Sequence, residues 1–283
     1  MDVVDPTLRG EHLGEELRAL RTGAKLTLAE ASKHIDSSGP TLSRLETGKG
    51  GVKFEDVAGL LAVYKVGGER RASLLAMALD ADKRGWTLRT SHKEQIATLR
   101  RVESKATKIV NFEPLVMPGL LQTIPYMLAL LNEASDLPED EIQRRMTNRL
   151  QRQQVLRFPC PEFTALITEN VLRQRVGGPA VLREQLKFLI EVAVRPKIHI
   201  RVLPNIDRAH PGLDGPYVRF YLPDRFGVVN LENRVFSQFL EEKDDVQAYD
   251  KLTEQLLALA LDEAESVRFI AGIVDELEGD ASS

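Results

Sequence analysis

The fold of the N-terminal part is decided by one stretch, Leu26-Thr-Leu-Ala-Glu-Ala-Ser-Lys-His-Ile-Asp-Ser-Ser-Gly-Pro-Thr-Leu-Ser-Arg-Leu-Glu-Thr-Gly48. Thr27 can cap a short helix, and Glu30 follows three residues later, where the partner of a capping box is expected. Ser38 can cap a second short helix, because Pro40 falls in the first turn, where a missing N–H costs nothing. The stretch therefore predicts two short helices joined by a tight turn.

Helical spacing of apolar residues continues on both sides of this stretch. Residues 13–20 carry three leucines at this spacing, and residues 54–66 and 69–81 repeat the pattern after a glycine-rich segment. We therefore expect residues 1–82 to form one small five-helix domain.

The remainder of the chain mixes helical and strand-like patterns. Helical spacing predicts helices over residues 94–110, 123–132, 139–156, 170–176, 180–194, 246–261 and 263–277. Short β-branched or aromatic runs bounded by proline, glycine and aspartate predict strands over residues 163–168, 198–203, 217–222 and 227–231.

These patterns predict a fold that is mainly α with an α+β C-terminal domain. We expect residues 83–111 to be a helical linker and residues 112–278 to form a small β-sheet flanked by helices. Residues 279–283 are expected to be a disordered tail.

Length and composition exclude several classes of protein. At 283 residues the chain is long enough for two domains. It has no apolar run near the roughly 18 residues that a membrane span needs, so we expect a cytoplasmic protein with no membrane partner. Cys160 is the only cysteine, which excludes an intramolecular disulfide, a redox pair and a cysteine-based zinc site. We expect Cys160 to be an inert thiol, with a redox sensor as the alternative.

The distribution of charge matters more than its sum. The formal net charge is −4, whereas phosphate contacts usually need a basic surface. Residues 83–108, however, hold eight basic and two acidic residues, and residues 144–157 hold five arginines and no acid. Ordinary solvated helix faces explain these runs equally well.

Residues 26–48 resemble the helix-turn-helix of the phage-repressor-like, or XRE, family. This resemblance implies that the second of the two helices enters the major groove of DNA. It makes Arg44 the main base reader, because a guanidinium group can bind guanine O6 and N7 together. Gly39 and Pro40 stand where well-known family members place glutamines, so base readout here relies on Arg44 and on DNA shape. The further DNA-contacting residues that the resemblance implies are Thr27, Ser38, Thr41, Ser43, Thr47, Lys49 and Lys53.

We also expect a homodimer on double-stranded DNA. One such module buries a small area and binds weakly, whereas two modules related by a twofold axis read the half-sites of a pseudo-palindromic operator. The alternative is a domain of this family that only packs, or one that has lost DNA binding.

Residues from about 103 to 277 resemble the C-terminal domain of a group of actinobacterial XRE-type regulators, which is described as antitoxin-like. This resemblance implies a transcriptional regulator commonly encoded beside a small partner protein, with no enzymatic activity. The segments that carry it are residues 112–123 with Tyr126, 149–153, 169–173, 176–177, 185–186, 200–204, Gly215, Glu232 and 264–267.

Two places in this second part are candidate binding sites for a ligand or partner. The tight turn that begins at Pro118 and Gly119 precedes a helix whose start can receive an anionic group, with Gln122 and Tyr126 close by in sequence. The alternative is that this turn only caps a helix. His210, in a proline- and glycine-rich loop, is a candidate pH-sensitive or ligand-facing group, and a solvated loop histidine is its alternative.

The sequence gives no support for an enzyme. It lacks a His-Glu-x-x-His motif, a glycine-rich phosphate loop and a serine between glycines, and its histidines are scattered. We expect no cofactor and no metal. The leading hypothesis is a sequence-specific regulator, acting as a repressor, whose C-terminal domain binds a small partner protein or a ligand that modulates DNA binding. The alternative is an antitoxin-like module that sequesters a neighbour-encoded protein and binds DNA only for autoregulation.

Overall fold

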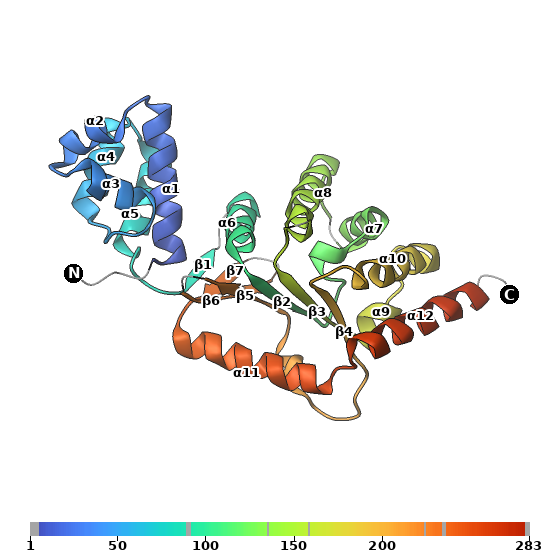
Figure 1. Ribbon diagram of the computed structural model, residues 1–283. Helices are drawn as coiled ribbons and strands as arrows, with labels where there is room; N and C mark the ends of the chain where they lie inside the picture. The colour runs from blue at the N-terminus through green and yellow to red at the C-terminus, as the bar shows by residue number, and fades with distance from the viewer. Residues whose placement is uncertain are drawn as a thin grey trace. The chain divides into compact units, whose positions relative to one another are not determined.

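The computed structural model describes residues 6–88, 92–134, 136–157, 159–223, 225–233 and 236–280. The chain divides into two compact units (Figure 1). The first unit consists of residues 1–88 and 238–242, and the second consists of residues 89–237 and 243–283. Within the described ranges, no helix is long and apolar enough to cross a membrane.

The first unit is a bundle of short helices, as the apolar spacing predicts. Its two short strands, β1 and β7, are neighbours. The elements are α1 (Leu8–Gly23), α2 (Leu28–Ser32), the 3-10 turn η1 (Lys33–Ile35), α3 (Gly39–Glu46), α4 (Phe54–Val63), α5 (Gly68–Leu79), β1 (Trp86–Leu88) and β7 (Ser237–Leu240).

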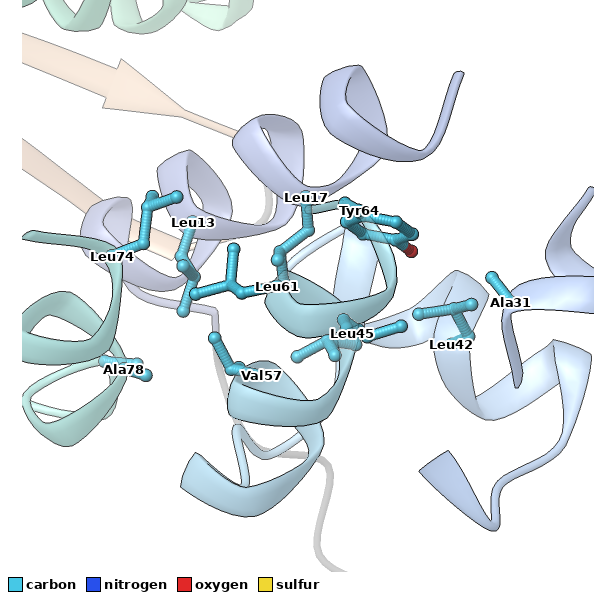
Figure 2. Close-up of a cluster of buried hydrophobic side chains, with 12 residues drawn as sticks. Leu13, Leu17, Ala31, Leu42, Leu45, Val57, Leu61, Tyr64, Leu74 and Ala78 are labelled. Atoms are coloured by element: carbon cyan, nitrogen blue, oxygen red, sulfur yellow. The ribbon is translucent and has the colours of Figure 1, made fainter. Parts of the chain in front are cut away.

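A single apolar core holds these five helices together (Figure 2). Leu13 and Leu17 from α1 share it with Leu42 and Leu45 from α3, and all four side chains are buried. The other buried members are Ala31, Val57, Leu60, Leu61, Tyr64, Leu74, Ala78 and Ala81. Burial of this shared face fixes α3 against the rest of the unit and leaves its opposite face to solvent.

Two glycines let α1 approach the end of α3 closely. A Cβ added at Gly14 would lie 2.5 Å from the Leu45 carbonyl oxygen and 2.7 Å from that of Glu46. Gly48, directly after α3, has a φ of +69°, and a Cβ there would lie 2.8 Å from the Cα of Glu11. Only glycine satisfies both the left-handed backbone and the close approach at residue 48.

The second unit contains strands in the order β6-β5-β2-β3-β4. β2 pairs in parallel with β3 and β3 in parallel with β4, whereas β5 pairs antiparallel with both β2 and β6. The strands are β2 (Lys108–Glu113), β3 (Glu162–Thr168), β4 (Ile198–Leu203), β5 (Tyr217–Leu222) and β6 (Arg225–Glu232).

Helices cover both faces of this sheet, with α11 on one face and α6, α7 and α8 on the other (Figure 1). The second unit is therefore the helix-flanked α+β domain that the sequence predicts. Its helices are α6 (His92–Lys105), η2 (Gly119–Leu121), α7 (Ile124–Ala134), α8 (Glu139–Gln153), η3 (Gln154–Leu156), α9 (Glu169–Arg173), α10 (Gly178–Ala193), η4 (Pro211–Asp214), α11 (Lys243–Leu259) and α12 (Glu263–Asp280).

The structure differs from the sequence prediction most clearly around residue 108. The spacing predicts a helix through Val110, but α6 ends at Lys105 and the next residues form the central strand β2. Ile109, Val110 and Phe112 are buried in the sheet, where β-branched and aromatic side chains pack well. The range 83–111, predicted as a helical linker, therefore contains β1, α6 and most of β2.

Smaller differences occur at other ends of elements. Strands β1 and β7 lie in segments for which the sequence predicts no strand. Helix α12 continues through Gly279 to Asp280, inside the predicted tail, and residues 281–283 lie outside the described residues.

Candidate nucleic-acid interface

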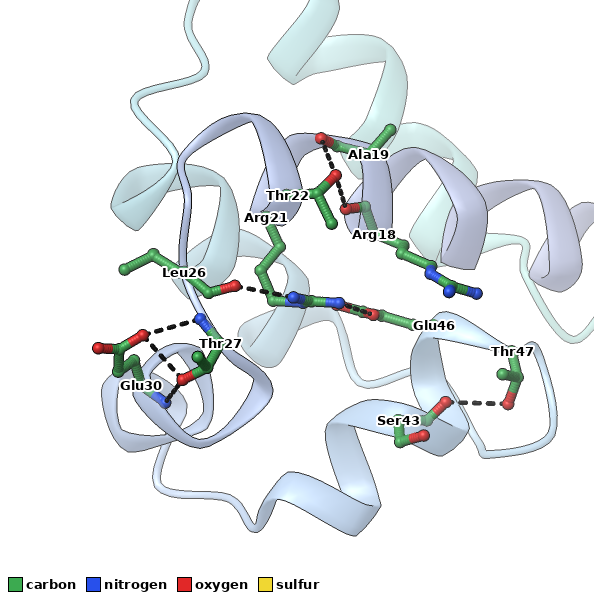
Figure 3. Close-up of polar contacts among 10 residues, drawn as sticks. All are labelled: Arg18, Ala19, Arg21, Thr22, Leu26, Thr27, Glu30, Ser43, Glu46 and Thr47. Carbon is green, nitrogen blue, oxygen red and sulfur yellow. Dashed lines mark hydrogen bonds and ion pairs between the residues drawn. The ribbon is translucent and has the colours of Figure 1, made fainter.

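Helix α2 begins with the capping box that the sequence predicts (Figure 3). The backbone N–H of Thr27 donates to Glu30 Oε2 at 2.8 Å, and the backbone N–H of Glu30 donates to Thr27 Oγ1 at 3.2 Å. Two donors that helix geometry leaves without a partner are thereby satisfied. The bond from the Thr27 N–H, and a second bond from the Thr27 hydroxyl to Glu30 Oε2 at 2.7 Å, lower the pKa of the Glu30 carboxyl.

Helix α3 begins at the predicted cap as well. Ser38 Oγ accepts from the backbone N–H of Thr41 at 3.3 Å, and the two hydroxyl groups lie 2.9 Å apart. Pro40 occupies the first turn, where its missing N–H breaks no hydrogen bond. Asp36 takes the left-handed conformation, with a φ of 47°, in the turn between α2 and α3.

A buried ion pair connects α1 with the end of α3 (Figure 3). Arg21 Nε donates to Glu46 Oε1 at 2.6 Å and Arg21 Nη2 donates to Glu46 Oε2 at 2.9 Å. Arg21 Nη1 also donates to the Leu26 carbonyl oxygen at 2.8 Å. The bond to Glu46 raises the pKa of the Arg21 guanidinium. One guanidinium group thus positions both α3 and the segment that leads into α2.

The eight predicted DNA-contacting residues all lie between positions 27 and 53 of the first unit. Ser43 is half-buried, and the other seven are exposed. The hydroxyl groups of four of them, Thr27, Ser38, Thr41 and Thr47, make hydrogen bonds within the unit. Thr47 Oγ1, for example, donates to the carbonyl oxygen of Ser43 at 2.9 Å (Figure 3).

The three positively charged residues in this set differ in their hydrogen bonding. Arg44 lies on the exposed face of α3, and Lys49 and Lys53 lie in the loop that leads to α4. Within the residues that the structure describes, none of these three side chains has a hydrogen bond or an ion pair. All three charged groups are therefore available to an external anion.

In the second unit, the predicted residues Pro118, Gly119 and Gln122 lie together, but not at the start of a long helix. Residues 119–121 form the 3-10 turn η2, and α7 begins only at Ile124. Gln122 is buried; its Nε2 donates to the Met117 carbonyl oxygen at 2.6 Å.

The sequence predicts that an anionic group binds at the start of α7. In the structure, protein groups already make hydrogen bonds there. The backbone N–H of Thr123 donates to Gln185 Oε1 at 2.7 Å. Tyr126 is fully buried, and its hydroxyl accepts from the backbone N–H of Met117 at 3.3 Å. Burial raises the pKa of Tyr126. Tyr126 is thus a core residue with an internal hydrogen bond.

His210 lies apart from this group. Its Nδ1 accepts from the backbone N–H of Gly212 at 3.2 Å and so caps the 3-10 turn η4. The side chain is half-buried and lines a separate hollow with Thr168 and Leu213. Cys160 is half-buried with a free thiol.

A cavity of about 330 Å³ lies beside Gly119 and Gln122. Among its lining residues are two that the sequence analysis does not select as binding residues, Glu113 from β2 and Arg149 from α8. Arg149 Nη1 donates to Gln122 Oε1 at 2.7 Å, which links Arg149 to the predicted residue Gln122. No spacing rule connects residues 36 positions apart on a strand and a helix, although both belong to the segments that carry the second resemblance.

Residues 12–74 match the family described as a helix-turn-helix domain. The first unit therefore contains a helix-turn-helix domain, a class that binds DNA through the second of its two helices. Residues 96–272 match the family described as a domain of unknown function, DUF5753. Because this match covers more than half of the chain, the protein belongs to the DUF5753 family.

No curated protein matches the chain. Among solved structures, it is similar to TrmBL2, described as an archaeal chromatin protein with a novel mode of DNA binding. The identity is 13%, the TM-score is 0.33, and the similarity covers 71% of this chain and 65% of TrmBL2. The chain thus spans slightly less than two thirds of that protein's length.

Proposed function

We propose that the protein is a sequence-specific transcriptional regulator of the phage-repressor-like type, in which α3 enters the major groove of DNA. The observation that carries this proposal is the position of Arg44 within a helix-turn-helix domain. Its guanidinium is exposed and has no partner among the described residues, while Leu42 and Leu45 anchor the same helix in the core. A free guanidinium on such a helix suits the O6 and N7 atoms of guanine.

The neighbouring residues complete the proposed contact. Lys49 and Lys53 lie in the loop between α3 and α4, and their charged groups suit phosphate oxygens and would set the register on the duplex. Because one module of this size binds weakly, we propose a homodimer that reads two half-sites of a pseudo-palindromic operator.

We further propose that the second unit binds a small ligand or partner protein and that this binding changes the affinity for the operator. In this role the protein acts as a repressor that responds to a signal. The cavity beside Gln122 supports a ligand in particular, because its volume lies at the lower end of the range for small-molecule sites.

The test is selection of bound fragments from sheared genomic DNA by the purified full-length protein at fixed salt. Arg44→Ala is the variant, and Arg70→Ala is the matched control, since Arg70 is also exposed but pairs with Glu16 on α1. We expect the wild type and the control to recover one twofold-symmetric site, and Arg44→Ala to lose it.

No enrichment by the wild-type protein would contradict the proposal. A different result would support the antitoxin-like module that the sequence leaves open. In that case the wild type enriches no DNA site, and both the wild type and Arg44→Ala capture a neighbour-encoded protein. The two outcomes differ in whether DNA or protein is recovered.

A further inference from the structure

The floor of the cavity is built from three neighbouring strands of the second unit. Asn111 of β2 lies opposite Val218 of β5, and Val218 lies opposite Asn230 of β6. Glu113 and Glu232 come two residues after these asparagines, so their side chains lie on the same face of the sheet. All five residues line the cavity. The floor therefore presents two carboxyl groups and two amides.

The carboxyl group of Glu113 is held in an unfavourable environment for a negative charge. Burial raises the pKa of Glu113 to about 8, and the negative charge of Glu232 adds to the shift. Asn111 Nδ2, 3.3 Å from Glu113 Oε1, and the positive charges of two arginines oppose it. The charged or titratable groups that act on Glu113 or line the same cavity are Glu232, Arg145, Arg149, Arg152, Tyr126 and Tyr217.

Three arginines of α8 line the cavity. Among the residues that the structure describes, two of them form ion pairs within the protein, and the third does not. Arg145 pairs with Glu141 at 2.8 Å, and Arg152 pairs with the buried carboxylate of Glu103 at 2.7 Å. Arg149 instead donates to the neutral amide of Gln122 and, within the described part of the chain, has no ion pair. Burial and the neighbouring charge of Arg152 lower the pKa of Arg149. Arg149 is half-buried and has no ion pair within the described residues, so its guanidinium is available to an anionic ligand group.

The cavity thus contains an acidic and a basic side chain that do not form an ion pair with each other. Glu113 and Arg149 line one cavity without a salt bridge between them within the described residues. Apolar side chains, among them Leu99, Val116 and Leu130, form another part of the lining. This combination suits one ligand with a cationic group, an anionic group and an apolar body.

We propose that this cavity binds a small zwitterion of the amino acid class with a large apolar side chain. The ammonium group contacts the carboxyl groups of Glu113 and Glu232, the carboxylate accepts hydrogen bonds from Arg149, and the side chain packs on the apolar wall. The effect of such a ligand on operator binding rests on the proposed function. The binding of the ligand to the cavity does not depend on that function.

The first experiment is isothermal titration calorimetry of the full-length protein with two series of probes. One series is L-phenylalanine, 3-phenylpropionate, which lacks the amine, and phenethylamine, which lacks the carboxylate. The other is L-leucine with its corresponding acid and amine. We expect at least one of the two amino acids to bind at least about tenfold more tightly than either of its analogues. Absence of binding by both amino acids, or equal binding by an analogue, would overturn the proposal.

Variants separate the two polar contacts. We expect Arg149→Gln to weaken amino acid binding about tenfold or more while leaving the affinity for the amine unchanged. Glu113→Gln is expected to weaken amino acid binding while leaving the affinity for the acid unchanged. Arg144→Gln is the matched control on α8, because Arg144 is exposed and pairs with Asp140 and Glu141 outside the cavity lining.

Far-UV circular dichroism checks that each variant folds. If Arg149→Gln does not fold, Arg149→Lys replaces it: the charge is kept, but the planar fork that binds a carboxylate is lost. Wild-type affinity for the amino acid in whichever arginine variant folds would overturn the assignment of Arg149.

Proton release provides a second readout. Because burial raises the pKa of Glu113 to about 8, a bound ammonium group that ionises this carboxyl group at pH 7 releases up to about one proton. Titration in phosphate and in Tris, whose ionisation enthalpies differ, measures this release, which Glu113→Gln should abolish. Release that is unchanged in Glu113→Gln would contradict the proposed contact.

Failure of amino acid binding and failure of operator binding can be distinguished experimentally. Arg44→Ala should not change the affinity for the amino acid, because Arg44 belongs to the first unit. In the absence of added amino acid, Arg149→Gln should likewise give the same operator selection as the wild type.

Discussion

The Arg21–Glu46 pair gives the most direct test of how α3 is held in place. The side chains are 11% and 3% exposed, and two hydrogen bonds join them. Glu46→Leu removes the carboxylate and leaves the guanidinium buried without its counter-ion. Removing one partner of a buried pair typically costs about 3–5 kcal/mol. We expect a loss of this size in the free energy of unfolding of the first unit.

Trp86 provides the assay, because it is the only tryptophan, is buried and belongs to the first unit. Its fluorescence is followed during urea unfolding of the full-length protein. With a slope of about 1–3 kcal/mol per molar urea, the midpoint should fall by at least about 1 M. The double variant Arg21→Met, Glu46→Leu should recover part of the loss, because no buried charge then remains.

Glu16→Leu is the matched control for this prediction. Glu16 pairs with Arg70 at 2.9 Å, but these side chains are 32% and 61% exposed, so water screens the interaction. Such surface pairs contribute about 0–1 kcal/mol. Equal shifts in Glu46→Leu and Glu16→Leu would refute the claim that the buried pair holds α3.

Two further predictions concern close packing and pH. Gly14→Ala should destabilise the first unit by about 1–3 kcal/mol, because the new Cβ meets the end of α3. Gly23→Ala in the same helix, where a Cβ meets nothing within 4 Å, should not, and equal urea midpoints would contradict this. Glu113 has a folded pKa of about 8, above its unfolded value, so its ionisation makes the second unit less stable as the pH rises from about 5 to 9. Glu113→Gln should therefore raise the melting temperature at pH 9 but not at pH 5, and a similar effect at both pH values would argue against the shift.

The helix-turn-helix could be predicted because its signals are local. The caps at Thr27 and Ser38 act within three residues, and the leucines that form the core recur at helical spacing. Strand β2 could not be predicted in the same way. Ile109 and Val110 continue an apolar spacing that fits a helix, and only pairing with β3 and β5, more than 50 residues away, makes them a strand.

The same distinction separates the two candidate sites. The exposed face of α3 follows from the sequence of one helix, so Arg44 could be selected from the sequence. Glu113 and Arg149 line the same cavity only because α8 packs over the sheet. Conversely, the sequence selects Tyr126, whose hydroxyl the structure uses inside the core.

The central claim is that Arg44 reads DNA from α3. The most direct measurement is fluorescence anisotropy with the genomically selected duplex and a scrambled duplex, at one salt concentration. The account predicts that Arg44→Ala binds the selected duplex about 5- to 150-fold more weakly, as expected for a lost contact of about 1–3 kcal/mol, while Arg70→Ala binds like the wild type. Wild-type affinity and discrimination in Arg44→Ala would contradict it.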